Sequence, residues 1–171
     1  MSLIAFNVGM LVADRVAEKA IWDTSYYKEM KKLHVSPTRM FAFAYCGEEL
    51  LNRHLSTLHD VLLTTLTLHA MEESQDTIKM PESIVHLMKP RSMIIVTHDR
   101  VYHKLEVEFS EIEMDDWCAN STYVPAFRAA LAYGLDTIKA AKTSVKFASG
   151  RDSIIDSVSC SKLRPMVKVK S

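Results

Sequence analysis

The first fifteen residues place two short apolar runs on either side of a tight connection. Leu3 to Phe6 and Met10 to Val12 have the length and composition of β-strands, and Asn7-Val8-Gly9 lies between them. Gly9 can take a positive φ angle without a steric penalty, which suits a tight turn. The pattern therefore predicts an antiparallel hairpin at the start of the chain.

The next stretch predicts a loop and then a second hairpin. The segment from Ala17 to Tyr27 mixes polar residues with tryptophan and tyrosines, and we expect a loop with one short strand at most. Lys32 to Ser36 and Arg39 to Tyr45 then flank Ser36-Pro37-Thr38, in which proline holds the second position of a turn. These two runs are expected to pair with each other.

After Gly47 the apolar positions recur every three or four residues, which is the helical period. The residues concerned are Leu50, Leu51, Leu55, Leu58, Val61, Leu62, Leu66 and Leu68. We expect a long helix from about Glu48 to Met71. A third hairpin is then predicted from Ser92 to Thr97 and from Val101 to Phe109.

The last third of the chain predicts two helices and closing strands. The helices run from about Tyr123 to Tyr133 and from Leu135 to Phe147, with Asp136 able to cap the second. Ser153 to Cys160 and Met166 to Val169 are predicted as strands. Hairpins and helices that occur in separate runs favour a layered α+β architecture over a doubly wound sheet.

Composition restricts the classes of partner. The 171 residues suit one compact domain, and 48% of them are apolar. Lys plus Arg and Asp plus Glu each number 21, so no net charge attracts nucleic acid or acidic lipid, whereas neutrality suits self-association. No run reaches the length of a membrane span and no signal peptide is evident, so we expect a soluble cytoplasmic protein.

Neither a disulfide framework nor a metal site is favoured. The three cysteines, Cys46, Cys118 and Cys160, lie far apart without a CxxC pair, as buried thiols in a reducing compartment do. The histidines of the long predicted helix are spaced by five and ten residues, which does not stack them on one helical face. No cofactor is expected.

Four segments, in chain order, resemble the proteasome β-subunit superfamily, including its bacterial ATP-dependent proteasome-like peptidase. They are SLIAFNVGMLVAD, KKLHV with MFAFAYCGEE, CANSTYVPAFRAALAYGLDTIKAAKTSVKFASG, and SIIDSVSC. The resemblance implies the fold of N-terminal nucleophile hydrolases over residues 1–171 as a single domain. That fold is a four-layer αββα sandwich of two antiparallel sheets flanked by helices.

The same resemblance implies catalytic roles for residues near the start of the chain. Ser2 corresponds to the nucleophile, and removal of Met1 would expose its α-amine as the base. Lys32 corresponds to the lysine that lowers the pKa of the hydroxyl, and Asp14 to the acidic residue that holds that lysine charged and oriented.

Further site residues are implied in the same way. The backbone amide of Gly47 or Cys46 falls where the family has its oxyanion donor. Ser121 matches a loop serine that helps to organise the terminal amine, and Ser149 matches a serine after the second long helix.

Each of these residues also has an ordinary structural interpretation. Ser2 could belong to a plain surface terminus, Asp14 could form a turn, and Lys32 could be part of the solvated basic run KEMKK. Ser121 and Ser149 could cap helices. Two functions therefore stay open: a serine-type endopeptidase subunit if Met1 is removed, or a catalytically inactive subunit that serves as an oligomeric scaffold.

Both functions imply the same kinds of partner. The resemblance implies a homo-oligomer, such as a ring, and an ATPase or a larger assembly as a further partner, with a polypeptide substrate if the chain is active. An isolated ligand-binding domain, in contrast, would be a monomer.

Overall fold

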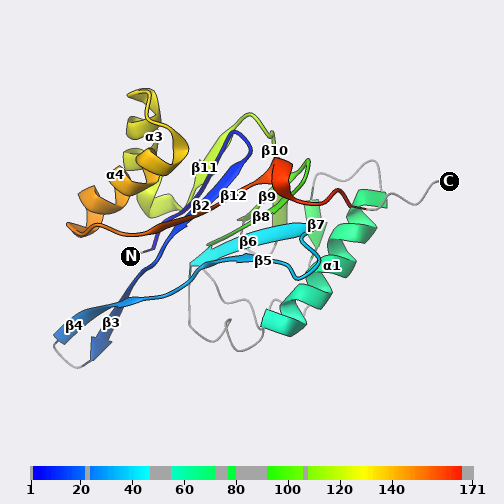
Figure 1. Ribbon diagram of the computed structural model, residues 1–171, viewed down its shortest axis with the longest axis horizontal. Helices are drawn as coiled ribbons and strands as arrows, with labels where there is room; N and C mark the ends of the chain where they lie inside the picture. Colours follow the sequence, from blue (N-terminus) through cyan, green and yellow to red (C-terminus); the bar gives the residue numbers. More distant parts are fainter. Residues whose placement is uncertain are drawn as a thin grey trace.

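The first sheet has four antiparallel strands and contains the start of the chain. The computed structural model describes residues 2–21, 24–46, 55–71, 77–79, 92–105 and 108–166 (Figure 1). The strands of this sheet are, in spatial order, β11 (Trp117–Ala119), β1 (Ile4–Asn7), β2 (Met10–Asp14) and β12 (Ile155–Ser159). Its central pair is the N-terminal hairpin, as predicted.

The second sheet has six antiparallel strands and contains the second and third predicted hairpins. In spatial order they are β5 (Leu33–Val35), β6 (Phe41–Cys46), β8 (Ser92–Thr97), β9 (Val101–Leu105), β10 (Glu108–Ile112) and β7 (Thr77–Lys79). Since β6 pairs with β8, the second and third hairpins are joined edge to edge.

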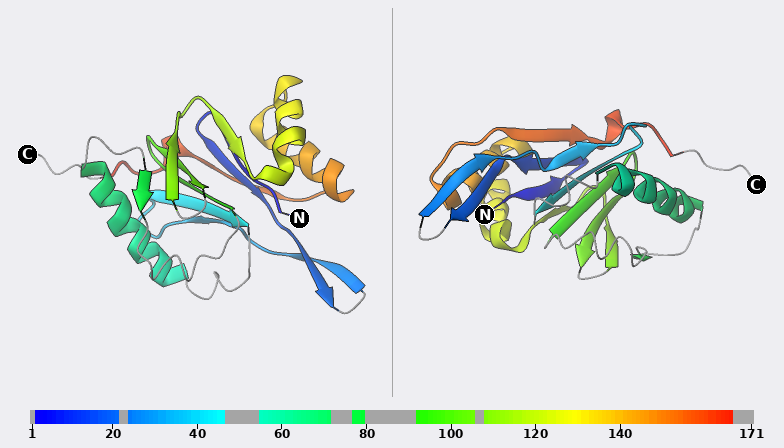
Figure 2. Two further views of the ribbon diagram at one scale, coloured as in Figure 1. Left: turned by 180° about the vertical axis from the view of Figure 1, so that it is seen from behind. Right: turned by 90° about the horizontal axis from the view of Figure 1, so that it is seen from below.

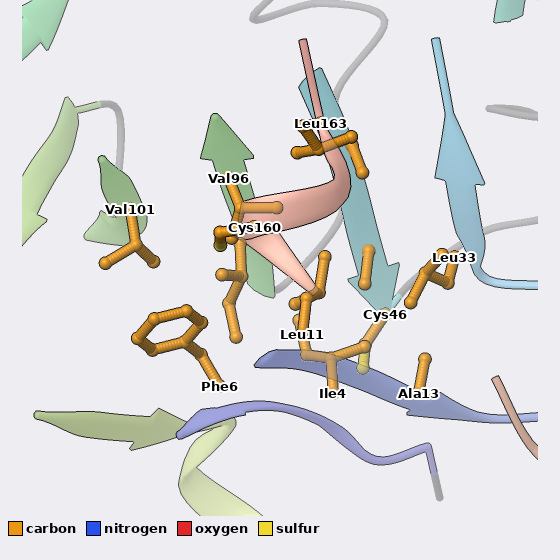
Figure 3. Close-up of a cluster of buried hydrophobic side chains, with 13 residues drawn as sticks. Ile4, Phe6, Leu11, Ala13, Leu33, Cys46, Val96, Val101, Cys160 and Leu163 are labelled. Atoms are coloured by element: carbon orange, nitrogen blue, oxygen red, sulfur yellow. The ribbon is translucent and has the colours of Figure 1, made fainter. Parts of the chain in front are cut away.

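The two sheets stack, and helices cover their outer faces. Buried residues of β1 and β2 meet those of β6, β8 and β9 between the sheets, including Phe6, Leu11, Val96, Val101 and Cys160 (Figure 3). The helix α1 (Leu55–Met71) packs on the second sheet, while α3 (Val124–Ala132) and α4 (Thr137–Ser149) pack on the first (Figure 1). The expected αββα sandwich is therefore confirmed.

Alternation along the strands explains why both faces of each sheet are apolar. On β1, Ile4 and Phe6 point between the sheets, whereas Ala5, together with Leu3 just before the strand, packs under α3 and α4. Sheets that are covered on both faces need such nearly continuous apolar runs. This requirement accounts for the apolar character of IAF, FAFAYC and MIIV.

The segment from Ala17 to Tyr27, which we expected to be a loop, is a hairpin. Its strands are β3 (Val16–Ile21) and β4 (Thr24–Glu29), and among the described residues they pair only with each other. The hairpin projects from the sandwich (Figure 2). A ribbon outside the layers needs no regular apolar face toward a core, so the sequence showed no periodicity there.

Other predicted bounds need smaller corrections. The strand expected from Val101 to Phe109 is two strands, β9 and β10, paired with each other. Met166 is not in a strand, and the rest of the strand predicted to Val169 lies outside the described residues. The part of the long helix predicted before Leu55 lies outside them as well.

The C-terminal helices agree with the prediction, including the cap. The Asp136 side chain accepts a hydrogen bond from the backbone N–H of Lys139 at 2.8 Å. Two short 3₁₀ turns, η2 (Ser121–Tyr123) and η3 (Cys160–Lys162), complete the described elements. Among the described helices, none combines the length and the hydropathy that a membrane crossing requires.

Candidate active site

The β3–β4 hairpin brings together two residues that are eighteen positions apart. Asp14 is the last residue of β2, and Lys32 directly precedes β5. The N–H of Met30 donates to the carbonyl of Arg15 at 2.8 Å, which closes the base of the hairpin. The two charged side chains therefore meet where the hairpin leaves the sandwich.

Lys32 and Asp14 form a buried ion pair. Lys32 Nζ contacts Asp14 Oδ1, and both side chains are 0% exposed. Lys32 Nζ also donates to the carbonyl oxygen of Val16 at 2.5 Å. Burial raises the pKa of Asp14 above its ordinary value, while the charge and the hydrogen bond of Lys32 oppose that rise. Buried groups whose pKa is perturbed, as that of Asp14 is, concentrate at functional sites.

The hydroxyl of Ser2 reaches the same carbonyl oxygen as the lysine. Ser2 Oγ donates to Val16 O at 3.4 Å, and the residue is half-buried. The serine hydroxyl and the lysine ammonium are thus held together by one shared acceptor. This arrangement brings together three of the residues that the resemblance implied, namely Ser2, Asp14 and Lys32.

Two side chains hold the backbone of Ser2: that of Asn120, which the sequence did not point to, and that of Cys46, for which the resemblance implied a role of the backbone amide only. Asn120 Nδ2 donates to the Ser2 carbonyl at 2.6 Å, and Cys46 Sγ donates to the same oxygen at 3.3 Å. Burial raises the pKa of Cys46 to about 12, so the thiol keeps its proton and acts as a donor. No sequence signal marks these contacts, because Asn120 lies 118 positions from Ser2.

The hydroxyl of Ser149 forms hydrogen bonds with backbone groups close to it in the sequence. It ends α4, its hydroxyl donates to the Val145 carbonyl at 2.7 Å, and its oxygen accepts from the N–H of Arg151 at 3.2 Å. Ser149 therefore satisfies backbone groups at the end of the helix. Nearby, Lys146 is exposed, and its ammonium lies 3.5 Å from Asp152.

Ser121 and the expected oxyanion donors are the remaining residues that the resemblance implied. Ser121 begins η2 directly after Asn120, and its side chain lies outside the described part of the molecule. Of the two expected oxyanion donors, Gly47 lies outside the described residues, and Cys46 is the last residue of β6.

A charged cleft of about 300 Å³ opens beside this cluster. It is lined by Arg15, Val16, Glu29, Arg151, Asp152, Ser153 and Ile154. Arg15 forms one wall, with its guanidinium paired to Asp156 at 2.7 and 2.8 Å. Because Val16 lines the cleft and also accepts from Ser2 and Lys32, the cleft adjoins the site.

The described residues offer no obvious metal site. No three His, Cys, Asp or Glu side chains among them lie close enough together to hold a metal ion. The cluster itself supplies a hydroxyl, an ammonium and a carboxylate.

Comparison with solved structures identifies the architecture. Eukaryotic HslV from Trypanosoma brucei superposes with a TM-score of 0.52 and 11% identity, covering 92% of this chain and 98% of the other. A protein called BPH from Thiobacillus denitrificans superposes with a TM-score of 0.61 and 12% identity, covering 94% and 98%. The chain has a proteasome β-subunit-like fold.

The proteasome-like fold is established by structure and not by sequence. No protein-family model matches the sequence. No curated protein matches it either. Identities of 11% and 12% carry the fold alone, so any activity has to be argued from the residues around Ser2.

Proposed function

We propose that this chain is a self-assembling, proteasome-like subunit and a serine-type endopeptidase whose nucleophile is Ser2, exposed by removal of Met1. The observation that carries the proposal is the buried Asp14–Lys32 pair, whose ammonium shares the Val16 carbonyl with the Ser2 hydroxyl. A fully buried ion pair costs several kcal/mol of desolvation per ion, so its presence beside a hydroxyl supports a chemical role.

In the proposed reaction, Ser2 Oγ attacks the carbonyl carbon of a substrate peptide bond while its proton moves to its own α-amine. An α-amine has an ordinary pKa of about 8, so it can accept a proton near neutral pH. The positive charge of Lys32 favours the developing alkoxide, and Asp14 orients the lysine.

The second half of the reaction returns the proton. When the peptide C–N bond breaks, the leaving amine takes the proton from the α-amine and an ester remains on Ser2. Water then hydrolyses the ester and regenerates the hydroxyl. On the resemblance alone, we assign stabilisation of the oxyanion to the amide of Gly47 and further support to Ser121 and Ser149.

Self-assembly is supported by an apolar groove between α3 and α4. The groove has a volume of about 470 Å³ and is lined by small side chains such as Ala126 and Ala129 and by the large aromatic side chains of Tyr133 and Phe147. Tyr133 is 91% exposed and Phe147 is 83% exposed. Aromatic side chains that protrude beside a depression suit a self-complementary interface, in which each copy fills the groove of the other.

The alternative function is a catalytically inactive subunit that uses the same fold as a scaffold. Two observations favour it. The hydroxyl of Ser149 donates to the carbonyl of Val145 within α4, and Lys146 places a positive charge in the last turn of the same helix. Both functions require assembly. They differ in whether Ser2 becomes an N-terminal residue and reacts.

The test begins with the intact mass of the protein from its native source. Loss of Met1 is expected, and a retained methionine would contradict the proposed use of the α-amine. The processed protein is then treated with a peptide epoxyketone, which forms a stable ring only with a hydroxyl and an adjacent free amine.

Variants of serine show where the reagent reacts. Labelling should disappear in Ser2→Ala and persist in Ser157→Ala, which removes the hydroxyl of an exposed serine on β12. If the processed, folded protein is not labelled, the endopeptidase proposal fails and the scaffold remains.

A further inference from the structure

The hydrogen-bond ladder beside β1 ends just before Ser2. On that side β1 pairs with β11, which ends at Ala119, and the chain turns into η2 from Ser121. The backbone N–H of Asn120 still donates to the carbonyl of Ile4 at 3.1 Å. Beyond this point, no strand in the described part of the chain pairs with the N–H of Ile4 or the carbonyl of Ser2 on this side.

The side-chain amide of Asn120 takes the place of the missing strand. Its Oδ1 accepts from the N–H of Ile4 at 3.1 Å, and its Nδ2 donates to the carbonyl of Ser2 at 2.6 Å. A carboxamide offers one acceptor and a donor in nearly the arrangement of a peptide group, so it can extend the ladder by one unit. Asn120 is only 7% exposed, which strengthens both hydrogen bonds.

The carbonyl of Ser2 is also held from the other sheet. Cys46, the last residue of β6, donates its thiol to the same oxygen at 3.3 Å and is 9% exposed. Ser2, two residues before β1, is therefore held by Asn120, which directly follows β11 of the first sheet, and by Cys46, which ends β6 of the second. Chain ends fray unless they are tied down, so these contacts decide where the Ser2 hydroxyl lies.

We propose that Asn120 is a positioning residue, whose side-chain amide holds Ser2 at the Lys32–Asp14 pair by replacing the missing β11 partner. The role rests on the proposed function, because the position of Ser2 matters for chemistry only if its hydroxyl reacts. The placement itself can be measured without activity, since release of Ser2 would uncover the thiol of Cys46.

The test is Asn120→Asp, which keeps the shape of the side chain and removes the donor. At pH 8 the introduced carboxylate still accepts from Ile4 but faces the carbonyl oxygen of Ser2, so the segment should be released. The rate at which Cys46 reacts with 4,4′-dithiodipyridine should rise about fivefold, the factor that corresponds to one lost net hydrogen bond. Each rate is divided by that of the same cysteine in the denatured chain at that pH.

The pH dependence separates positioning from a general loss of stability. A buried carboxyl has a raised pKa, so at pH 5 the introduced group is protonated and donates again. The protection of Cys46 should then return toward the wild-type level. Cys160 serves as the internal control and should stay protected at both pH values. It is 1% exposed, and its N–H donates to the carbonyl of Gly9 at the turn of the β1–β2 hairpin, whereas Asn120 pairs with Ile4 at the start of β1.

Three outcomes would overturn the proposal. They are an unchanged Cys46 rate at pH 8, equal exposure of Cys46 and Cys160, and exposure of Cys46 that does not reverse at pH 5. Ser2→Ala keeps the backbone carbonyl and should leave Cys46 protected in the wild-type background. The thiol assay needs no turnover, so its result is independent of the labelling result. If the epoxyketone does not label Ser2 but the protection of Cys46 still depends on Asn120, the endopeptidase proposal fails and the placement of Ser2 by Asn120 is still supported.

Discussion

At the scale of single residues, the Lys32–Asp14 pair is costly. Both side chains are fully buried, and Asp14 Oδ2 has no hydrogen-bond partner among the described residues. The attraction between buried charges offsets their desolvation only when the remaining polar atoms are also satisfied. Apolar residues of similar volume would stabilise this position at least as well, so the pair is better explained by chemistry than by folding.

This cost can be measured with a double-mutant cycle. Lys32→Met leaves the Asp14 carboxylate buried without its partner and should destabilise the fold by about 3–5 kcal/mol. Adding Asp14→Leu removes that unpaired charge and should restore the free energy of unfolding to the wild-type value or above it. The measurement is urea denaturation of the wild type, of Lys32→Met, of Asp14→Leu and of the double variant.

An exposed ion pair is the matched control for the buried one. Lys146 pairs with Asp152 at 3.5 Å with both side chains largely in solvent, so Lys146→Met should change the stability by less than about 0.5 kcal/mol. If the double variant is as unstable as Lys32→Met alone, the pair is structural and its catalytic interpretation loses its energetic support.

Sequence reasoning found the reactive groups of the site but not what holds them. Ser2, Asp14 and Lys32 stood out through their place in short segments that resemble a known family. Asn120 and the Val16 carbonyl did not, because their contacts join segments that are far apart in the chain. A backbone carbonyl also leaves no trace in the sequence, so its role as the shared acceptor required the structure.

At the scale of elements, periodicity predicted what packs against a core. The β1–β2 and β5–β6 hairpins and the helices α3 and α4 all follow from apolar spacing, since each buries a regular face. The projecting hairpin β3–β4 was missed. Yet that hairpin matters for the site, because Asp14 precedes it and Lys32 follows it.

The packing of β5 on its neighbours creates a pH-dependent element. His34, in β5, lies 5.5 Å from Phe43 and stacks on Tyr45 at 5.9 Å between ring centroids. Its buried Nε2 has no hydrogen-bond partner among the described residues. Burial, together with the charge of Lys31, lowers the pKa of His34 to about 4.

The sign of the effect follows from this lowered pKa. The unfolded chain binds a proton at His34 near pH 6.5, whereas the folded chain resists protonation until about pH 4. The stabilisation is therefore complete above pH 6.5 and is lost as the pH falls to 4. We expect a loss of about 2 kcal/mol, allowing for the solvent that reaches the partly exposed ring.

Replacing the imidazole tests this assignment. His34→Phe preserves the aromatic packing and should reduce the slope of stability against pH between 6.5 and 4, measured by urea midpoints at several pH values. Some slope should remain, because burial also lowers the pKa of His59 and His103. A slope identical to that of the wild type would show that the imidazole of His34 is not the group responsible.

At the scale of the whole molecule, the layer formed by α3 and α4 has an apolar groove on its surface. The groove between α3 and α4 keeps Tyr133 and Phe147 almost fully exposed above small side chains such as Ala126 and Ala129. Exposed aromatic side chains beside an apolar groove are typical of interaction surfaces. The site at Ser2 lies at the base of the β3–β4 hairpin, where the serine hydroxyl donates to the carbonyl of Val16.

If copies of the chain assemble through this groove, substitutions in the groove should lower the molar mass of the oligomer in solution. Phe147→Asp places a charge in the centre of the groove and should shift the protein toward the monomer in multi-angle light scattering. The fold should be preserved, because Phe147 is 83% exposed and contributes little to the core. Thr143→Asp, at the lining of the same groove, should act in the same direction.

A matched substitution elsewhere keeps this result interpretable. Ile154→Asp changes another exposed apolar residue, 58% in solvent and outside the α3–α4 groove, so it should leave the oligomer intact. If all three variants keep the wild-type mass, assembly does not use this groove. If the wild type is itself a monomer, the fold acts alone, and labelling of Ser2 would then have to be explained within a single chain.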